Sequence, residues 1–460
     1  MKRSRRATSV AGTVLLAAIV AGALLFGPYI GLTSGHLGES TFASVVEPVG
    51  VAATPGRVLV THPFCGNPRE VLSIDSSGVV SVFATLPPLA KGCREEYIAV
   101  AGPADPTQPG FPSPTRGGFQ SNFVFVTQGP NIVKISPEGV VSAFTTIPVC
   151  RPSRNGITFD RVGSFGFNMI VACNGGKVFR VTASGTPTLV ANVAAALGLS
   201  SVRIENPDVA PMSFVPYGGH IFVAADVLSK VLAISPSGAV SAVADWPSAE
   251  GVHFIPATKC TFGPSLGSFF TAIFRQADKG QEPGSIVQFP LAAFSGLSGR
   301  ALVTSDGSGG IGLLTSTGHS TIIPTTFHSN LGRHEGSTFV DCTVPLILQI
   351  IVKPGFIPHT IDPQGKGTVP VAILSNPIFN ALTDPIVSTI TFGFTGTEQS
   401  IESCNTKSGQ DVNGDGRLDL ICHAVIGSLG IPTQEPYSGP LILKLRYNAP
   451  TGDPDGEGIN

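Results

Sequence analysis

The feature that most constrains the fold of this chain is an internal repeat. Each copy has an apolar alternating run, a tight turn ending in glycine, and a second alternating run. The copies are EVLSIDSSGVVSVFATLP (70–87), NIVKISPEGVVSAFTTIP (131–148), KVFRVTASGTPTLVANV (177–193), KVLAISPSGAVSAVADWP (230–247) and the fainter IGLLTSTGHSTIIPTT (311–326). Alternating runs on both sides of such a turn predict β-hairpins. The turn glycines are Gly78, Gly139, Gly185, Gly238 and Gly318.

Further apolar strands precede the hairpins, as in NFVFVTQ (122–128) and HIFVAAD (220–226), and shorter runs such as NGITFD (155–160) precede those. Four strands in a unit of about 40–50 residues predict the blade of a β-propeller. Six blades fit best, with a degenerate copy near 285–303, and five or seven remain open. We expect 336–342 to supply the innermost strand of the blade that 56–62 begins, which would remove free sheet edges.

These units resemble the NHL and SMP-30/gluconolactonase-like propellers over about residues 50–342. The resemblance rests on the order of strands and turns in each blade. It implies the architecture and says little about function, because one fold hosts many functions.

The character of the sequence changes after Cys342. Residues 344–450 hold strands, turns and prolines without the blade repeat, as in IVKPGFIPHTIDPQGKGTVPVAILS. This part resembles a β-rich C-terminal module of exported bacterial proteins. We therefore expect an all-β chain with a propeller at 41–343, a β-sandwich-like domain at 344–450 and a flexible tail at 451–460.

The N-terminus reads MKRSRR and continues into an apolar run from about Val14 to Leu32. A basic start before such a run indicates a secretory signal peptide or an uncleaved membrane anchor within residues 1–40, and both remain open. Charged residues are only 13% and the net charge is −2. This low charge argues against nucleic-acid binding. Because of the N-terminal segment, we expect the body of the chain to lie outside the cell.

Eight cysteines in an exported chain favour disulfides over reduced thiols. No CxxC motif occurs, which argues against a zinc site. Connectivity does not follow from sequence alone, and pairing of neighbours along the chain is the simplest hypothesis. It gives Cys65–Cys93, Cys150–Cys173, Cys260–Cys342 and Cys404–Cys422.

The most explicit chemical motif is DVNGDGRLDLIC at 411–422. Side-chain oxygens stand at its positions 1, 3, 5 and 9, position 7 offers a backbone carbonyl, and Gly416 occupies the bend. This spacing predicts a structural calcium site, and the ligands would be Asp411, Asn413, Asp415, Arg417 and Asp419. Cys422 replaces the glutamate of an EF-hand, so the loop is similar to those of dockerins or integrin-type repeats. A metal-free turn rich in Asp and Asn is the alternative.

A second candidate site lies where the innermost strands begin. A polar residue opens each of them, namely Glu96, Asn155, Asn206, Glu250 and Glu335. If the blades align, these residues gather at one mouth of the central tunnel. The resemblance to SMP-30-like lactonases implies a divalent metal there, held by Glu, Asn and Asp side chains. Asp208 is the nearest candidate for the aspartate ligand. The alternative is an ordinary polar tunnel mouth.

Two functions remain open at this stage. The first is an exported binding or scaffolding protein without catalysis, whose ligand is a protein, a glycan or a small molecule. The second is a metal-dependent lactonase or esterase that works through Glu250, Asn155, Asn206 and Glu335. We favour the first, because the sequence assembles no complete catalytic set. A membrane is expected as partner only through the N-terminal segment.

Overall fold

The computed structural model describes residues 38–445 with gaps at 55, 90–91, 103–114, 258–261, 263–266, 275–283, 307–309, 315–319, 322–332, 342–347, 357–359, 376–378 and 433–440. The apolar N-terminal run and the tail at 451–460 therefore lie outside the described residues. Among the helices that are described, none has the length and apolar character needed to cross a membrane.

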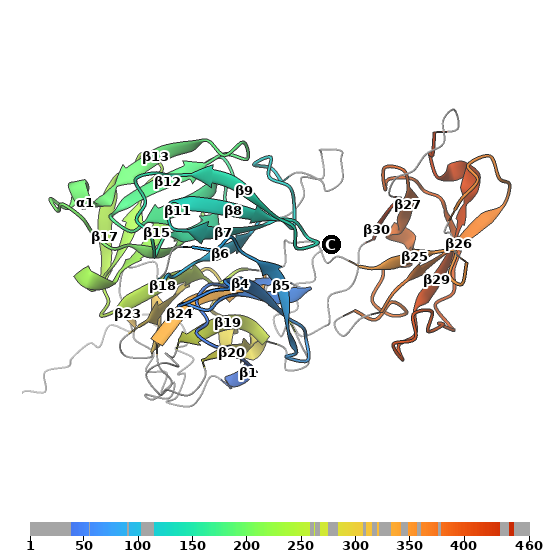
Figure 1. The fold of residues 1–460 in the computed structure, drawn as a ribbon, viewed down its shortest axis with the longest axis horizontal. Coiled ribbons are helices and arrows are strands. Elements are labelled where there is room, and N and C mark those ends of the chain that lie inside the picture. Colours follow the sequence, from blue (N-terminus) through green and yellow to red (C-terminus); the bar gives the residue numbers. More distant parts are fainter. Residues whose placement is uncertain are drawn as a thin grey trace, which may run out of the picture. The chain divides into compact units, whose positions relative to one another are not determined.

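Six antiparallel sheets of four strands form the larger part of the structure (Figure 1). Blade 1 contains β2 (Val51–Thr54), β3 (Arg57–His62), β4 (Glu70–Ile74) and β5 (Val80–Thr85). Blade 2 contains β6 (Ile98–Val100), β7 (Val124–Gln128), β8 (Asn131–Ile135) and β9 (Val141–Thr146). Blade 3 contains β10 (Gly156–Phe159), β11 (Met169–Cys173), β12 (Lys177–Val181) and β13 (Pro187–Asn192). Blade 4 contains β14 (Glu205–Val209), β15 (Ile221–Ala225), β16 (Lys230–Ile234) and β17 (Val240–Asp245).

The last two blades exchange strands. Blade 5 has the order β18 (Ala249–Phe254), β21 (Ala301–Ser305), β22 (Ile311–Leu314) and β23 (Ser320–Thr321). Blade 6 has the order β24 (Arg333–Phe339), β19 (Gly267–Phe274), β20 (Ser285–Pro290) and β1 (Ser40–Ser44). After β18 the chain thus builds the middle of blade 6, returns to complete blade 5, and then adds β24 to blade 6.

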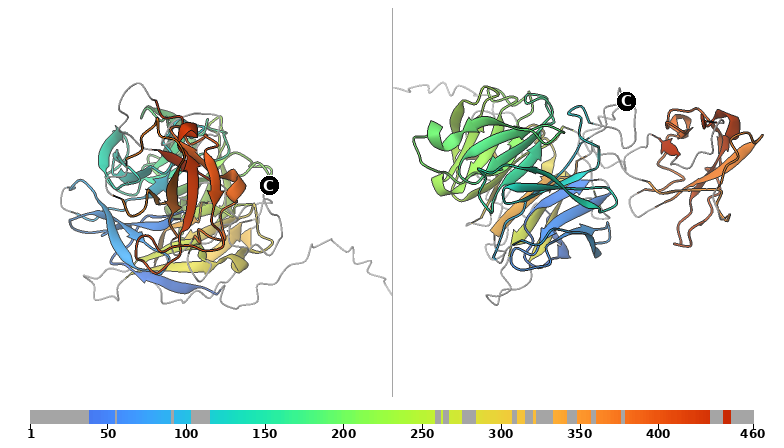
Figure 2. Two further views of the ribbon diagram at one scale, coloured as in Figure 1. Left: turned by 90° about the vertical axis from the view of Figure 1, so that its right-hand side faces the viewer. Right: turned by 45° about the horizontal axis from the view of Figure 1, so that its top comes forward.

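The six sheets form a closed ring. Each innermost strand contacts the next in the order β2, β6, β10, β14, β18, β24, and β24 contacts β2 again. The chain is therefore a six-bladed β-propeller, as its repeats predict. Figure 2 shows the blades from two further directions.

The ring closes in a different blade from the one predicted. Strand β24 is the innermost strand of blade 6, while the blade that contains β3 has its own innermost strand, β2. Strand β1 pairs with β20 at the outer edge of blade 6. This blade therefore contains strands from both the beginning and the end of the propeller sequence (Figure 1). The expectation failed because β2 is a short four-residue strand that directly precedes β3.

The turn glycines of the repeat also pack the blades together. Gly78 has φ +84° and its N–H donates a 3.0 Å hydrogen bond to the carbonyl of Asp75. A Cβ on Gly139 would lie 2.4 Å from the carbonyl oxygen of Phe83, and one on Gly238 would lie 2.4 Å from that of Val190. Each of these hairpin tips therefore sits against the outer strand of the preceding blade, where only glycine fits.

The main apolar cores lie between neighbouring blades. One cluster combines Leu59 and Val71 of blade 1 with Val124 and Val133 of blade 2. Another combines Ile170 of blade 3 with Leu232 of blade 4, where the helix α1 (Val193–Ala196) adds two buried residues. Fully burying such a side chain contributes about 1.5–3 kcal/mol, so the blades stabilise one another.

The C-terminal part forms two further sheets. The first has the order β25 (Ile350–Val352), β26 (Thr368–Ile373), β29 (Leu420–Val425) and β28 (Ile401–Cys404), and the second pairs β27 (Thr391–Gly393) with β30 (Ile442–Lys444). Phe392 of the second sheet packs in one apolar cluster with Val371 and Ala424 of the first. Short 3-10 turns precede β27 (Val387–Thr389) and follow β29 (Ile426–Ser428). Two more lie in the propeller, at Asp226–Leu228 and Leu291–Phe294.

Candidate functional site

The innermost strands run parallel around the channel, so their first residues gather at one mouth. Bridges between neighbouring blades are parallel at Glu96 with Asn155 and at Ala53 with Val340. Glycine allows the backbones to approach closely here. A Cβ on Gly336 would lie 2.5 Å from the carbonyl oxygen of Val49. This explains why glycine follows the opening polar residue in several blades.

Four glutamates form a buried cluster at this mouth, which we call the acidic cluster: Glu95, Glu205, Glu250 and Glu335. All four residues are less than 5% exposed. The Tyr97 hydroxyl donates a 2.9 Å hydrogen bond to Oε1 of Glu250 and lies 3.4 Å from Oε2 of Glu205. Burial and the neighbouring Glu205 carboxylate together hold the pKa of Glu250 well above its usual range.

Arginines cover the acidic cluster from the solvent side. Arg154 forms ion pairs of 2.6 Å with Glu95 and 3.3 Å with Glu205. The Nε atom of Arg203 lies 3.4 Å from Glu205 and donates a 2.7 Å hydrogen bond to Asp226. Arginine is suited to this position because its guanidinium bridges two carboxylates.

Burial and the charges of neighbouring carboxylates raise the pKa values of Glu95, Glu250 and Glu335. Burial, together with the charge of Glu205, raises the pKa of Glu95 to about 8. The pKa values of Glu250 and Glu335 also lie well above the usual range, because both are buried and face other carboxylates. One oxygen each of Glu95 and Glu335 has no hydrogen-bond partner within the described residues. Clustered perturbed carboxyls of this kind are common at functional sites.

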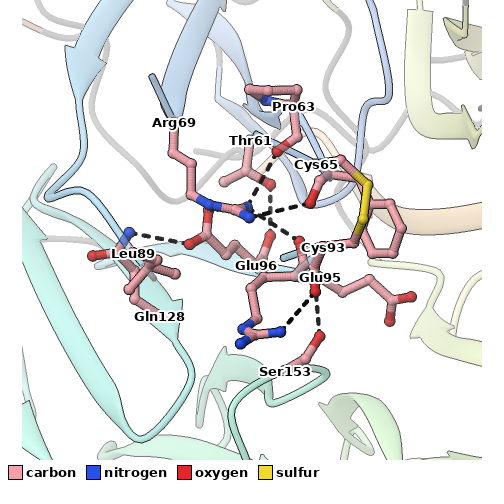
Figure 3. Close-up of polar contacts among 12 residues, drawn as sticks. Thr61, Pro63, Cys65, Arg69, Leu89, Cys93, Glu95, Glu96, Gln128 and Ser153 are labelled. Atoms are coloured by element: carbon pink, nitrogen blue, oxygen red, sulfur yellow. Dashed lines mark hydrogen bonds and ion pairs between the residues drawn. A yellow bond between two sulfur atoms is a disulfide. The ribbon is translucent and has the colours of Figure 1, made fainter. Parts of the chain in front are cut away.

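Glu96 has another environment (Figure 3). It lies 3.6 Å from Arg69 and accepts a 3.0 Å hydrogen bond from Gln128, so its side chain packs between blades 1 and 2. Arg69 also donates to the carbonyls of Pro63, Phe64, Gly92 and Arg94. The Cys65–Cys93 disulfide ties the same two loops together. This network fixes the segment that leads into Glu95.

The other polar residues predicted for the mouth separate into two groups. Glu250 and Glu335 belong to the acidic cluster. Asn155 instead donates to the carbonyls of Gly129 and Arg151 and accepts from the N–H of Asn174, which makes it a brace between loops. Asn206 donates a 3.1 Å hydrogen bond to the backbone carbonyl of Glu250. Glu95 and Glu205 were not predicted from the sequence, and each stands one residue before a predicted position, Glu96 and Asn206.

A cavity of about 540 Å³ occupies the channel, and all six innermost strands contribute to its wall. Tyr97 lines it and reaches the acidic cluster with its hydroxyl. Much of the rest of the wall is aliphatic or aromatic, including Phe159, Phe254 and Phe339. Cavities of roughly 300–1,000 Å³ with apolar walls and a few polar groups are typical of small-molecule sites.

Four ionisable side chains line the cavity besides Tyr97: Arg161, Asp208, His253 and Asp341. Arg161 and Asp341 form a close ion pair, and Arg161 also donates to the carbonyl of Val100. Burial raises the pKa of Asp208 to about 6 and lowers that of His253 to about 3. At neutral pH the histidine is therefore uncharged. Asp208, named above as a possible metal ligand, lies in this cavity wall.

The loop at 411–419 is held by its own hydrogen bonds. The Asp411 carboxylate accepts from the N–H groups of Gly414, Asp415 and Gly416. Asp415 accepts from Asn413 and from the N–H of Arg417, while the buried Asp419 accepts from Val412 and Ser375. The donor set consists of hard oxygens, as calcium requires. Within the described ranges, no three Asp, Glu, His or Cys side chains converge as ligands of one metal ion.

Three of the four expected cysteine pairs are disulfides in the structure: Cys65–Cys93, Cys150–Cys173 and Cys404–Cys422. Cys404 and Cys422 face each other on β28 and β29, so this bond brackets the 411–419 loop. The fourth pair, Cys260–Cys342, lies outside the described residues.

No protein-family model matches the chain, and no curated protein matches it. Among solved structures, a nidogen/laminin complex is similar with 10% identity and a TM-score of 0.40, covering 64% of this chain and 85% of the other. A streptogramin B lyase shares 15% identity with a TM-score of 0.39, over 65% and 91% of the two chains. A calcium-binding protein, regucalcin, from Agrobacterium tumefaciens shares 10% identity with a TM-score of 0.34, over 73% and 83%. Likenesses this distant carry no functional argument.

Proposed function

We propose that this chain is an exported binding protein whose propeller holds a small molecule in the central cavity. The observation that carries the proposal is the cavity itself, since about 540 Å³ is the size of an ordinary ligand site. Export is supported by three disulfides and by the basic and apolar start of the sequence.

A cavity-filling variant tests this proposal. Thr158 is half-buried on β10 and lines the cavity, so Thr158→Trp places an indole in the ligand's space. The uncharged fluorophore N-phenyl-1-naphthylamine, which brightens in apolar surroundings, serves as the ligand. We expect saturable one-to-one binding to the wild-type protein and at least about tenfold weaker binding to the variant.

The matched control is Thr146→Trp on the outer strand β9, where the side chain is exposed. This variant should bind the fluorophore as the wild type does. Circular dichroism establishes that both variants are folded. Equal binding by the wild type and by folded Thr158→Trp would show that the cavity is not the binding site.

The same proposal includes a calcium ion at the 411–419 loop, which would fix a long turn of the C-terminal part. The supporting observation is the donor set, in which Asp411, Asn413 and Asp415 offer exposed side-chain oxygens. Arg417 would contribute its carbonyl, and Asp419 its carboxylate. The Cys404–Cys422 disulfide holds both ends of the loop in place.

A metal-dependent lactonase or esterase is the second candidate function. It is favoured by the gathering of Glu250 and Glu335 in the acidic cluster, where burial and neighbouring carboxylates also raise their pKa values. A panel of lactones and esters with added divalent metal tests it. Turnover that is lost in Glu250→Gln would establish the hydrolase, whereas no turnover above the rate in buffer is the result that the binding proposal expects.

A further inference from the structure

The charged groups of the cavity wall do not balance. Among the described lining residues there are two carboxylates, Asp208 and Asp341, and one guanidinium, Arg161. The histidine adds no positive charge at neutral pH, because burial lowers the pKa of His253 to about 3. With both carboxylates ionised, the wall carries one negative charge in excess.

The excess charge belongs to Asp208. Arg161 is engaged with Asp341 and with the carbonyl of Val100. Within the described residues Asp208 has two hydrogen bonds, both from backbone N–H groups: Val209 donates to Oδ1 and Phe254 donates to Oδ2, each at 2.8 Å. No ion pair reaches it from the side chains that the structure describes. A carboxylate offers about four acceptor positions, so about two remain for a ligand.

The rest of the wall near this carboxylate is apolar and aromatic. Phe254 follows His253 on β18 and contacts the rings of Phe214 and Phe222 behind the wall. Phe159 and Phe339 also line the cavity. An apolar wall strengthens an ion pair by excluding water.

We propose that the ligand of the central cavity is a small organic cation, an amine on an apolar body, whose ammonium group binds the carboxylate of Asp208. This inference rests on the proposed function and adds the chemical class of the ligand. The ammonium would use the free acceptor positions of Asp208, while the apolar body fills the apolar remainder of the cavity. An anion would meet uncompensated negative charge and bind weakly.

Three matched compounds test the inference: 1-naphthylmethylamine (a cation), 1-naphthalenemethanol (neutral) and 1-naphthoate (an anion). Calorimetric titrations of the full chain at pH 7.5 with EDTA measure their affinities and exclude bridging metals. We expect the amine to bind at least about tenfold more tightly than the alcohol, and the naphthoate to bind most weakly. Asp208→Asn should reduce the affinity for the amine to that for the alcohol. Asp245→Asn, which removes the same charge from an exposed position on β17, should leave the order unchanged.

The outcomes separate the two proposals. If the alcohol or the naphthoate binds as tightly as the amine, or if Asp208→Asn still prefers the amine, the proposal of a cationic ligand is wrong. The proposal that the cavity binds a small molecule is then retained. If none of the three compounds binds, both proposals are contradicted.

Discussion

The hydroxyl of Tyr97 donates a 2.9 Å hydrogen bond to the carboxyl of Glu250 on the blade three positions further round the ring. Blades 2 and 5 are thus joined across the channel by side chains that are almost fully buried. Because Tyr97 also lines the cavity, this contact links the acidic cluster to the cavity wall. Several measurable properties follow from this arrangement.

The first prediction concerns pH and stability. The folded-state pKa values of Glu95, Glu250 and Glu335 lie above those of an unfolded chain, so the folded protein holds protons that the unfolded chain releases. Their stabilising contribution is complete below about pH 4.5 and is lost as the pH rises through the folded pKa values. Each released proton should lower the free energy of unfolding by up to about 1.4 kcal/mol per pH unit.

Urea unfolding between pH 5 and pH 9 measures this slope. Glu250→Gln should flatten it, because an amide releases no proton over this range in either the folded or the unfolded chain. Glu138→Gln, on an exposed turn, serves as the control and should leave the slope unchanged. An identical slope in Glu250→Gln and the wild type would show that Glu250 carries no extra proton.

The second prediction concerns the buried Arg69–Glu96 pair. Arg69→Met removes an ion pair and hydrogen bonds to four carbonyls, and leaves Glu96 without a cation. Removing one partner of a buried pair costs about 3–5 kcal/mol of unfolding free energy. Arg180→Met, exposed on β12, should cost less than about 0.5 kcal/mol. Urea denaturation of both variants gives the comparison, and equal effects would contradict the role assigned to Arg69.

The third prediction concerns the close approach of innermost strands. In Gly336→Ala the new methyl group would lie 2.5 Å from the carbonyl oxygen of Val49, with backbone atoms of Gly50 and Val51 at 2.8 Å. Backbone cannot move aside easily, so we expect a loss of about 2 kcal/mol or more. Gly427→Ala has no atom within 4 Å of its new Cβ and should be nearly neutral. Thermal unfolding measures the stability of both variants. An unchanged stability of Gly336→Ala would mean that the innermost strands do not pack as closely at Gly336 as the structure shows.

The fourth prediction concerns calcium. If the 411–419 loop binds the ion, calcium should raise the melting temperature of the C-terminal part and EDTA should reverse the shift. Asp415→Ala should abolish the calcium-dependent shift. Asp362→Ala, in a turn of the same part of the chain, should preserve it. A melting temperature that is unaffected by calcium would instead support the metal-free turn.

The sequence predicted the blades well because each hairpin carries its own turn glycine and its own alternation. It could not predict the exchange of strands between blades 5 and 6. The hairpin signals of β19 with β20 and of β21 with β22 are the same whichever blade they join. Blade 6 is completed around β19 and β20 by β24 and β1, which are distant from each other in the sequence.

The side chains at the mouth were only partly predictable, for a related reason. Register shifts occur at Ala249/Gly251 in β18, around Glu335 in β24 and between Glu205 and Asp208 in β14, whereas β10 pairs without a shift. A bulge turns the following side chain to the other face of a strand. Glu205, Glu250 and Glu335 lie at these shifts and belong to the acidic cluster, whereas the side chain of Asn155 binds to neighbouring loops. No residue type in the sequence signals these bulges.

The most direct test of the central claim is a crystal structure of the protein with N-phenyl-1-naphthylamine. The account predicts electron density for the ligand inside the channel, in contact with Phe159, Phe254 and Phe339. Density for the ligand only at another surface, with the channel filled by ordered water, would contradict it.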